Sequence, residues 1–301
     1  MENWVRAFVR RFFRGTSGSA PNGPSILTCT NLWPVRRHSG SATALSKAGR
    51  LVMRGELAGA PVKLFEAASA DHARFIEAIW RHERLGDHLP RICLVEGPFV
   101  VAEWVTRAAR GEPSAEDLVA LQLRLHRAPV AGLPQPGFDY WSDIVMPRFR
   151  RAAVLLREQE LVESIETRVS AAWYGSPQRL MHPDLTPANL VLGGDRRWRI
   201  VDNELLAPGG LPLLDVCNTA RALFPPEAQK YADLYFHEAR VMPSREDIKI
   251  LQDAWLARRV GGAFVAGDLL RAASMVRAFK SGLNILPFSP MGALADGHGR
   301  S

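Results

Sequence analysis

Four polar residues lie near one another in the sequence at spacings that suit phosphoryl transfer from a nucleotide. His182, Asp184 and Asn189 occupy one proline-flanked loop, and Asp202 ends an apolar strand thirteen residues after Asn189. Phosphoryl transfer needs a carboxylate that orients the attacking hydroxyl, and a carboxylate with an amide that hold the magnesium ion on the phosphates. The pattern predicts Asp184 as the catalytic carboxylate and Asn189 and Asp202 as magnesium ligands.

These residues resemble the catalytic loop of the aminoglycoside phosphotransferase and choline kinase family, distant relatives of the protein kinases. Residues 182–191, HPDLTPANLV, are similar to the family's H-x-D-x-x-x-x-N loop, and residues 200–202 to its metal-binding strand. Residues 212–216 resemble a later structural P-x-x-D-L motif, whose aspartate here is Asp215. The resemblance implies ATP and Mg2+ as cofactors, and it gives His182 a scaffold role in the catalytic loop.

The resemblance continues upstream, where it predicts the nucleotide-binding residues. Residues 59–65, GAPVKLF, are similar to the strand that carries the phosphate-binding lysine, here Lys63. The helical pattern that follows brings Glu77 to pair with Lys63, and Glu83 on the same helix is a substitute for Glu77. Residues further on look like the last small-lobe strand entering the hinge, so two of them are expected to contact the nucleotide: Glu103 and Val105.

Two departures from the family pattern keep other functions open. The best candidate for a glycine-rich phosphate loop, residues 39–43, lacks the full G-x-G-x-x-G, and Asn203 and Glu204 follow Asp202 in place of an aromatic residue. One alternative is therefore a catalytically impaired kinase fold that serves as a binding or scaffold protein. A phosphoesterase with metal ligands at 182, 184 and 202 is disfavoured by the proline-bounded loop and the position of Asn189.

Hydrophobic periodicity predicts strands with one helix over residues 26–105 and mostly helices over 106–301. We expect an α+β, bilobal protein-kinase-like fold, in which a small, mainly antiparallel β lobe carries one helix and the larger lobe is mostly helical. In the small lobe the expected elements are hairpins of 50–54 with 61–65 and of 90–95 with 99–104, and a helix over 70–85. In the large lobe they are helices over 114–126, 140–173, 212–224, 226–240, 244–258 and 261–280, and strands over 189–192 and 198–202.

The first 25 residues form a separate segment. Residues 1–14 place aromatic and aliphatic side chains on one half of a helical wheel and arginines on the other, and a Gly, Ser and Pro linker follows at 15–25. Such a helix can lie in a membrane interface with its arginines on anionic lipid. It can equally pack on the kinase domain, and the sequence leaves both open.

Composition and charge distribution indicate the cellular compartment to be expected and exclude one class of partner. The chain has 301 residues, of which 47% are hydrophobic, and no apolar run approaches the roughly 20 residues that span a bilayer. Three widely spaced cysteines indicate a reducing, cytoplasmic location without disulfides. Of the net charge of +7, the arm 1–14 carries +3 (four Arg, one Glu) and 106–301 carries +2 (24 basic, 22 acidic residues), so no nucleic-acid partner is expected.

The resulting hypothesis is an ATP- and magnesium-dependent kinase that transfers the γ-phosphate to a hydroxyl of a sugar, amino alcohol or aminoglycoside. Only twelve residues separate Asp202 from Asp215, which on the resemblance is too short for a peptide-docking activation loop. The nearly neutral helical half fits a polycationic aminoglycoside poorly. Together with the basic N-terminal arm, this favours a sugar or lipid-linked acceptor at the inner face of a membrane, as for lipopolysaccharide-core sugar kinases of similar fold.

Overall fold

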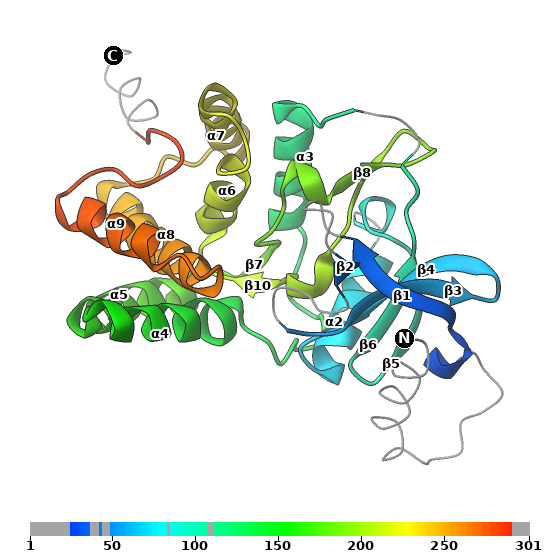
Figure 1. The fold of residues 1–301 in the computed structure, drawn as a ribbon. Helices are drawn as coiled ribbons and strands as arrows, with labels where there is room; N and C mark the ends of the chain where they lie inside the picture. The colour runs from blue at the N-terminus through cyan, green and yellow to red at the C-terminus, as the bar shows by residue number, and fades with distance from the viewer. Residues whose placement is uncertain (1–24, 37–41, 44–48, 83–84, 108–110, 291–301) are drawn as a thin grey trace. The chain divides into compact units, whose positions relative to one another are not determined.

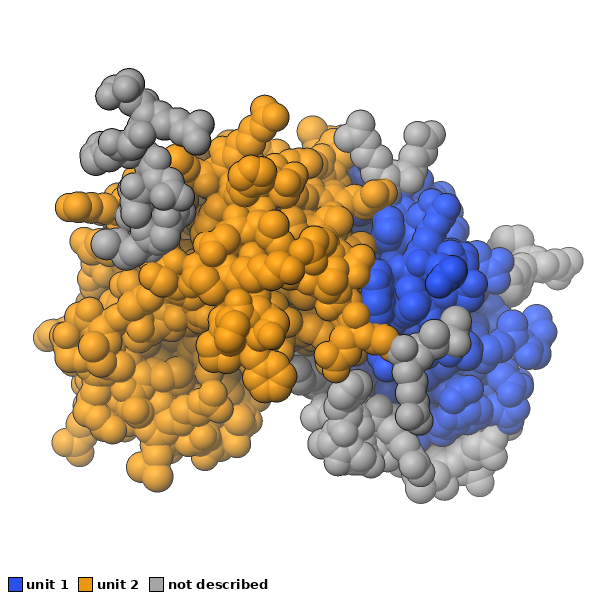
Figure 2. Space-filling model, turned by 90° about the horizontal axis from the view of Figure 1, so that it is seen from above, with its two compact units in different colours: residues 1–109, 133–137, 191–204 blue, residues 110–132, 138–190, 205–301 orange. Residues whose placement is uncertain are grey.

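The computed structural model describes residues 25–36, 42–43, 49–82, 85–107 and 111–290. The expected N-terminal helix, Glu83 and most of the candidate phosphate loop at 39–43 lie outside these residues. The chain forms two compact units (Figures 1 and 2). Unit 1 comprises residues 1–109, 133–137 and 191–204, and unit 2 comprises residues 110–132, 138–190 and 205–301. No helix of the described ranges is long and apolar enough to cross a membrane.

Unit 1 is built on an antiparallel sheet with the strand order β2-β1-β3-β4-β6-β5. Both expected hairpins are present, β3 with β4 and β5 with β6, but the first turn is shorter than expected. It consists of Ala58 and Gly59, both with positive φ (51° and 78°), the conformation that suits a two-residue hairpin turn. The strands are β1 (Thr30–Arg36), β2 (Ala42–Thr43), β3 (Val52–Leu57), β4 (Ala60–Glu66), β5 (Ile92–Glu96) and β6 (Phe99–Glu103).

Gly55 lies inside β3 and pairs with Val62, although the sequence pattern placed it in the turn. A Cβ at this position would lie 2.6 Å from Leu32 Cδ2 and 3.0 Å from the Thr30 carbonyl oxygen. The glycine therefore lets β1 approach β3 closely. A glycine that is needed for close packing of strands cannot be told from a turn glycine by the local sequence.

The strand β4 shows how the sheet positions Lys63. Successive side chains of a strand point to opposite faces, so Val62 and Leu64 join one apolar cluster while Phe65 joins the other, beneath the helix α2 (Ala70–Arg81). Lys63 shares the face of Phe65, and its Nζ lies 5.5 Å from the centroid of that ring. Helix α2 begins at the cap residue Ser69 and is shorter than the expected 70–85.

Unit 2 is mostly helical, as expected, and its helices α4, α5, α8 and α9 pack on one another (Figure 1). Strand β7 (Arg179–Met181), before the predicted catalytic loop, pairs with β10 (Ala207–Gly209), which comes after that loop. The helices are α3 (Ala115–His126), a π-helix (Trp141–Val145), α4 (Met146–Leu156), α5 (Gln159–Gly175), α6 (Pro212–Ala220), α7 (Pro225–Ala239), α8 (Arg245–Val265) and α9 (Leu269–Lys280). Strands β8 (Leu190–Leu192) and β9 (Trp198–Ile200) pair with each other, and most of both belongs to unit 1. β9 ends two residues before Asp202, so the expected strand 198–202 is shorter than predicted.

The single long helix expected over 140–173 is wrong, because the chain breaks after α4. Arg157 takes a left-handed conformation (φ 60°, ψ 45°), and its N–H closes the end of α4 on the carbonyl of Ala153. The break lets α5 turn back so that both helices pack on α8. No glycine or proline marks the position, so local sequence carries no signal for it.

The expected break near residue 260 is also wrong, because α8 runs through Gly261 and Gly262 to Val265. A Cβ on Gly261 would lie 2.9 Å from Arg148 Cβ and 3.1 Å from Phe149 N on α4. The glycine thus permits the close approach of α8 to α4. The chain leaves the helix at Gly267, where φ is 75°.

We predict that Gly261→Ala destabilises the protein. The methyl group would overlap the α4 backbone, at a cost of about 1–3 kcal/mol, which exceeds the gain of about 1 kcal/mol for alanine in a helix. Gly175→Ala, in α5 with open space around the new Cβ, is the matched control and should not destabilise. Urea unfolding of both variants measures the difference; equal stability would show that α8 and α4 are not in close contact at Gly261.

Candidate functional site

The loop of residues 182–189, which the sequence predicts to be catalytic and which we call the catalytic loop, follows β7 and is held by a buried carboxylate. The backbone N–H of His182 donates to Asp215 Oδ2 at 2.6 Å, and both residues are fully buried. Leu185 N–H then donates to the His182 carbonyl at 3.0 Å, which closes a turn around Asp184. Asp215 therefore holds the loop as expected, whereas the bracing role of the His182 imidazole remains a prediction.

Asp215 is itself surrounded by polar side chains of unit 2. Gln122 Nε2 and His126 Nε2 on α3 each lie 3.5 Å from Asp215 Oδ2. Thr219, one turn after Asp215 on α6, donates to the Leu185 carbonyl at 2.7 Å. A buried carboxylate is costly unless it is hydrogen-bonded. The His182 N–H and the α3 side chains therefore stabilise the Asp215 charge, whereas Thr219 holds the loop directly. Residues from α3 and α6 thus determine where Asp184 lies.

The loop brings Asp184 and Asn189 together. Asn189 Nδ2 donates to the Asp184 carbonyl at 2.7 Å and to its Oδ2 at 3.0 Å. Residues 187–189 form a short 3-10 turn that begins at Pro187 and spans the interval between the two side chains. The amide nitrogen is used within the loop, so the amide oxygen is the atom of Asn189 that can bind a metal ion.

Unit 1 places Lys63 between two carboxylates. Its Nζ pairs with Asp202 Oδ1 and lies 3.9 Å from Glu204 Oε2. Burial lowers the pKa of Lys63, but the charges of Asp202 and Glu204 outweigh that effect and raise it. Asp202 has a left-handed backbone (φ 65°) just after β9, and its side chain is 46% exposed. Lys63 is therefore a charged ammonium with two acidic partners, of which Asp202 is accessible to solvent.

The expected pairing of Lys63 with Glu77 is wrong in this structure. Glu77 pairs instead with Arg81, four residues later on α2, at 2.6 Å. The second carboxylate near Lys63 is Glu204, two residues after Asp202, and the sequence pattern does not predict this contact. Its closeness to Lys63 depends on the path of the chain after β9, and no spacing rule in the sequence predicts that path.

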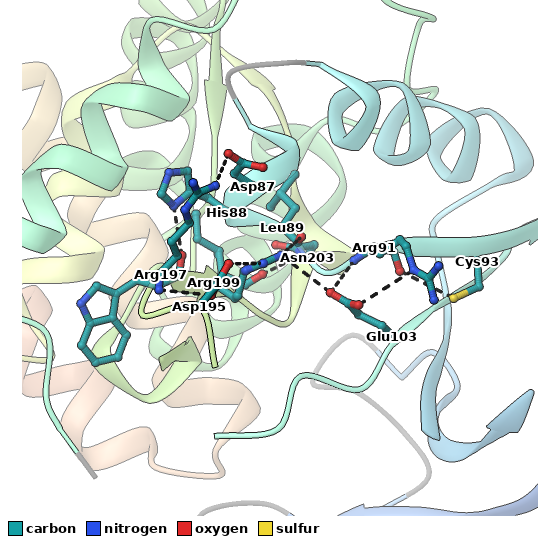
Figure 3. Close-up of polar contacts among 12 residues, drawn as sticks. Asp87, His88, Leu89, Arg91, Cys93, Glu103, Asp195, Arg197, Arg199 and Asn203 are labelled. Carbon is teal, nitrogen blue, oxygen red and sulfur yellow. Dashed lines mark hydrogen bonds and ion pairs between the residues drawn. The ribbon is translucent and has the colours of Figure 1, made fainter. Parts of the chain in front are cut away.

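The two residues expected at the hinge have different surroundings. Glu103, at the end of β6, accepts a hydrogen bond from Arg91 N–H at 3.0 Å and lies 3.7 Å from Arg199 Nη1 (Figure 3). Its own N–H donates to the Arg91 carbonyl. Val105 follows the strand, and its N–H and C=O form no hydrogen bond with other described residues. A nucleotide contact through the Val105 backbone is compatible with this geometry, and both assignments remain predictions.

Magnesium binding in a kinase requires only a few oxygen ligands from the protein. No group of three or more His, Cys, Asp or Glu among the described residues is arranged to hold a metal ion. Magnesium in kinases needs none, since it is bound by one or two protein oxygens together with phosphates and water. The two predicted ligands, Asn189 and Asp202, belong to different units. An amide oxygen and a carboxylate are donors of the kind that Mg2+ accepts.

Comparison with solved structures identifies the fold. No family model matches the chain, and no curated protein matches it in sequence. A choline kinase, LicA of Streptococcus pneumoniae, superimposes with a TM-score of 0.56 at 11% identity, covering 92% of this chain and 99% of its own. The Plasmodium vivax ethanolamine kinase gives 0.53 at 11% identity, covering 93% and 96%. A thermostable mutant of aminoglycoside phosphotransferase APH(4)-Ia gives 0.53 at 11% identity, covering 90% and 96%. The chain therefore has the protein-kinase-like fold of the small-molecule phosphotransferases.

Proposed function

We propose that the protein is a small-molecule kinase that transfers the γ-phosphate of ATP to an acceptor hydroxyl. The observation that carries the proposal is the double hydrogen bond of Asn189 with Asp184 in a loop anchored by buried Asp215. A capping aspartate in a surface loop would need no such support. The structural neighbours named above, two kinases and an aminoglycoside phosphotransferase, support this function, and LicA has also been solved with AMP.

Each residue then has a distinct role. Asp184 accepts a hydrogen bond from the acceptor hydroxyl and directs its oxygen at the phosphate. Lys63 contributes positive charge to the phosphates, and Asn189 and Asp202 hold Mg2+, which when bound neutralises phosphate charge. We retain the expected division of labour, with residues 26–105 binding the nucleotide and residues 106–301 binding the acceptor.

A scaffold function is the alternative, and one observation favours it. Lys63 and Asp202 already satisfy each other, so the pair could be purely structural in a kinase fold that has lost activity. Nucleotide binding and turnover separate the two functions.

We predict that Asp184→Asn abolishes phosphate transfer and leaves the fold intact. Removal of a positioned acid–base group lowers the turnover number by about 10²–10⁴-fold, whereas the amide has nearly the same shape as the carboxylate. The control is Asp233→Asn, an exposed aspartate on α7. ATP consumption is measured against a panel of sugars, amino alcohols, aminoglycosides and their acidic derivatives. Undiminished turnover in Asp184→Asn would refute the kinase mechanism.

A second prediction concerns the metal. ATP should raise the melting temperature only with Mg2+ or Mn2+, because the ion links the phosphates to Asn189 and Asp202. At 100 times the dissociation constant the stabilisation is about 2.7 kcal/mol. It should disappear with chelator and weaken in Asp202→Asn. Binding of ATP that is indifferent to metal would favour the scaffold function.

A third prediction concerns location. From the sequence of residues 1–14, which lie outside the described residues, we propose a cytoplasmic enzyme that associates peripherally with anionic membrane. The whole chain should co-sediment with anionic vesicles in a salt-sensitive manner, because arginine–phosphate attraction is screened by salt. A chain that begins at Ser25 should not. If both partition equally, the arm is not a membrane anchor.

A further inference from the structure

Four arginines of unit 2 form a group near the catalytic loop, which we call the arginine cluster: Arg221, Arg258, Arg259 and Arg271. Arg221 ends α6, Arg258 and Arg259 lie on α8, and Arg271 lies in the first turn of α9. Their charges act on one another. Burial, followed by the charges of its three companions, lowers the pKa of Arg259 to about 10.

The cluster extends toward Asp184. Partial burial and the charges of Arg258 and Arg271 lower the pKa of Arg221, although its side chain still reaches solvent, while the Asp184 carboxylate acts on that pKa in the opposite direction. Geometry places Arg221 beside the loop of Asp184, because Thr219, two residues before Arg221, donates to the Leu185 carbonyl at 2.7 Å. Helix α8 contacts both α6 and α9, so the four arginines lie on helices that pack together.

The arginine cluster has no carboxylate of its own. None of its four side chains forms an ion pair with any described residue, whereas Arg150 and Arg168 nearby on α4 and α5 pair with Glu166 and Asp253. Like charges held together repel, and a protein surface normally relieves this with an acidic partner. The missing partner is negative charge, and the structure does not supply it from the described part of the chain.

Two buried polar groups, one on Arg258 of the cluster and one on Tyr140, form no hydrogen bond with any described residue. The Nε atom of Arg258 is buried and forms no hydrogen bond with any described residue. The hydroxyl of Tyr140, in a residue only 1% exposed, likewise has none there. That hydroxyl lies among the same charges: after burial, which raises its pKa most, Arg258 lowers it, and Asp215 and Asp184 raise it. Buried polar groups without a hydrogen-bond partner are rare, and a bound anion is one explanation for two of them beside the same arginines.

The backbone of α8 leaves room for the Arg258 guanidinium. A Cβ on Gly262 would lie 3.0 Å from Arg258 Nη1. A larger residue would press on the guanidinium from one turn further along the helix. Gly262 thus gives this side chain freedom that it would lack beside an alanine.

We propose that the acceptor is an anion: the phosphate or carboxylate group of a hydroxylated small molecule binds the arginine cluster, and one of its hydroxyls reaches Asp184. Arginine is well suited to the task, since its planar fork binds phosphate and carboxylate oxygens through two parallel hydrogen bonds. The same positive charge would repel a cationic amino alcohol or aminoglycoside. This inference rests on the proposed kinase function and narrows its substrate class.

Acceptor discrimination tests the inference on the full chain. Matched acceptors differ only in charge: glycerol against glycerol 3-phosphate, and glucose against glucose 6-phosphate and glucuronate. We expect turnover with the phosphorylated or the carboxylated members, and the two arms show which anion is preferred. Phosphorylation of the neutral members, choline or an aminoglycoside with higher kcat/KM would overturn the anionic acceptor while leaving the kinase function in place.

Substitution of single arginines tests whether the cluster binds the anionic acceptor. Arg221→Gln changes an exposed side chain, and Arg258→Gln a half-buried one. Each should raise KM for the anionic acceptor about tenfold or more, as expected for loss of a charged hydrogen bond, with no change in the KM for ATP. Arg277→Gln, on an exposed arginine of α9 outside the cluster, is the control. An unchanged acceptor KM in folded Arg221→Gln and Arg258→Gln would overturn the assignment, as would a change confined to ATP.

A binding measurement makes the test independent of turnover. Inorganic phosphate, compared with chloride at equal ionic strength and without nucleotide, should raise the melting temperature of the unaltered chain but not of Arg221→Gln. Phosphate binding without phosphate transfer to any acceptor would refute the kinase function and retain the anion site. Transfer without this phosphate stabilisation would refute the site and retain the kinase.

Discussion

The hydrogen bond from the His182 backbone to buried Asp215 is the constraint on which the catalytic loop depends. A carboxylate with no exposure must find donors, and here it finds them on the loop and on α3. The same contacts that lower the cost of the buried charge therefore fix the loop that carries Asp184. Helical packing in unit 2 and the position of the catalytic carboxylate are thus parts of one arrangement, and disturbance of α3 or α6 reaches the site.

In unit 1 the charge of a largely buried lysine is compensated by two acidic side chains. Lys63 is 12% exposed on a strand whose other face is apolar, and its charge is compensated by Asp202 and Glu204. Asp202 remains 46% exposed. A lysine held beside an accessible carboxylate can exchange part of that interaction for another anion without an uncompensated charge being buried. The pairing is compatible with the proposed contacts of Lys63 with phosphates and of Asp202 with Mg2+.

The arginine cluster shows why average charge is a poor guide to a substrate. Residues 106–301 carry a charge of only +2, which is compatible with a neutral acceptor. Within this range, however, Glu166 and Asp253 pair with Arg150 and Arg168, and Asp215 binds the loop. The four arginines of the cluster, on three helices, form no ion pair with any described residue. A sequence region of low net charge can therefore contain a locally positive group of side chains, because the pairing of charges, as well as composition, determines the local field.

Local chemistry in the sequence was sufficient to predict much of this protein: the hairpins of unit 1, helix α3, and the spacing that joins Asp184 to Asn189 all depend on neighbours within a few residues. Contacts between distant segments decided the rest. Lys63 meets Glu204 in place of Glu77, the chain turns at Arg157, and Gly261 stays helical because α4 passes beside it. Periodicity and capping record interactions along the chain, whereas the partner of a charge or the reason for a glycine is determined by what folding brings next to it.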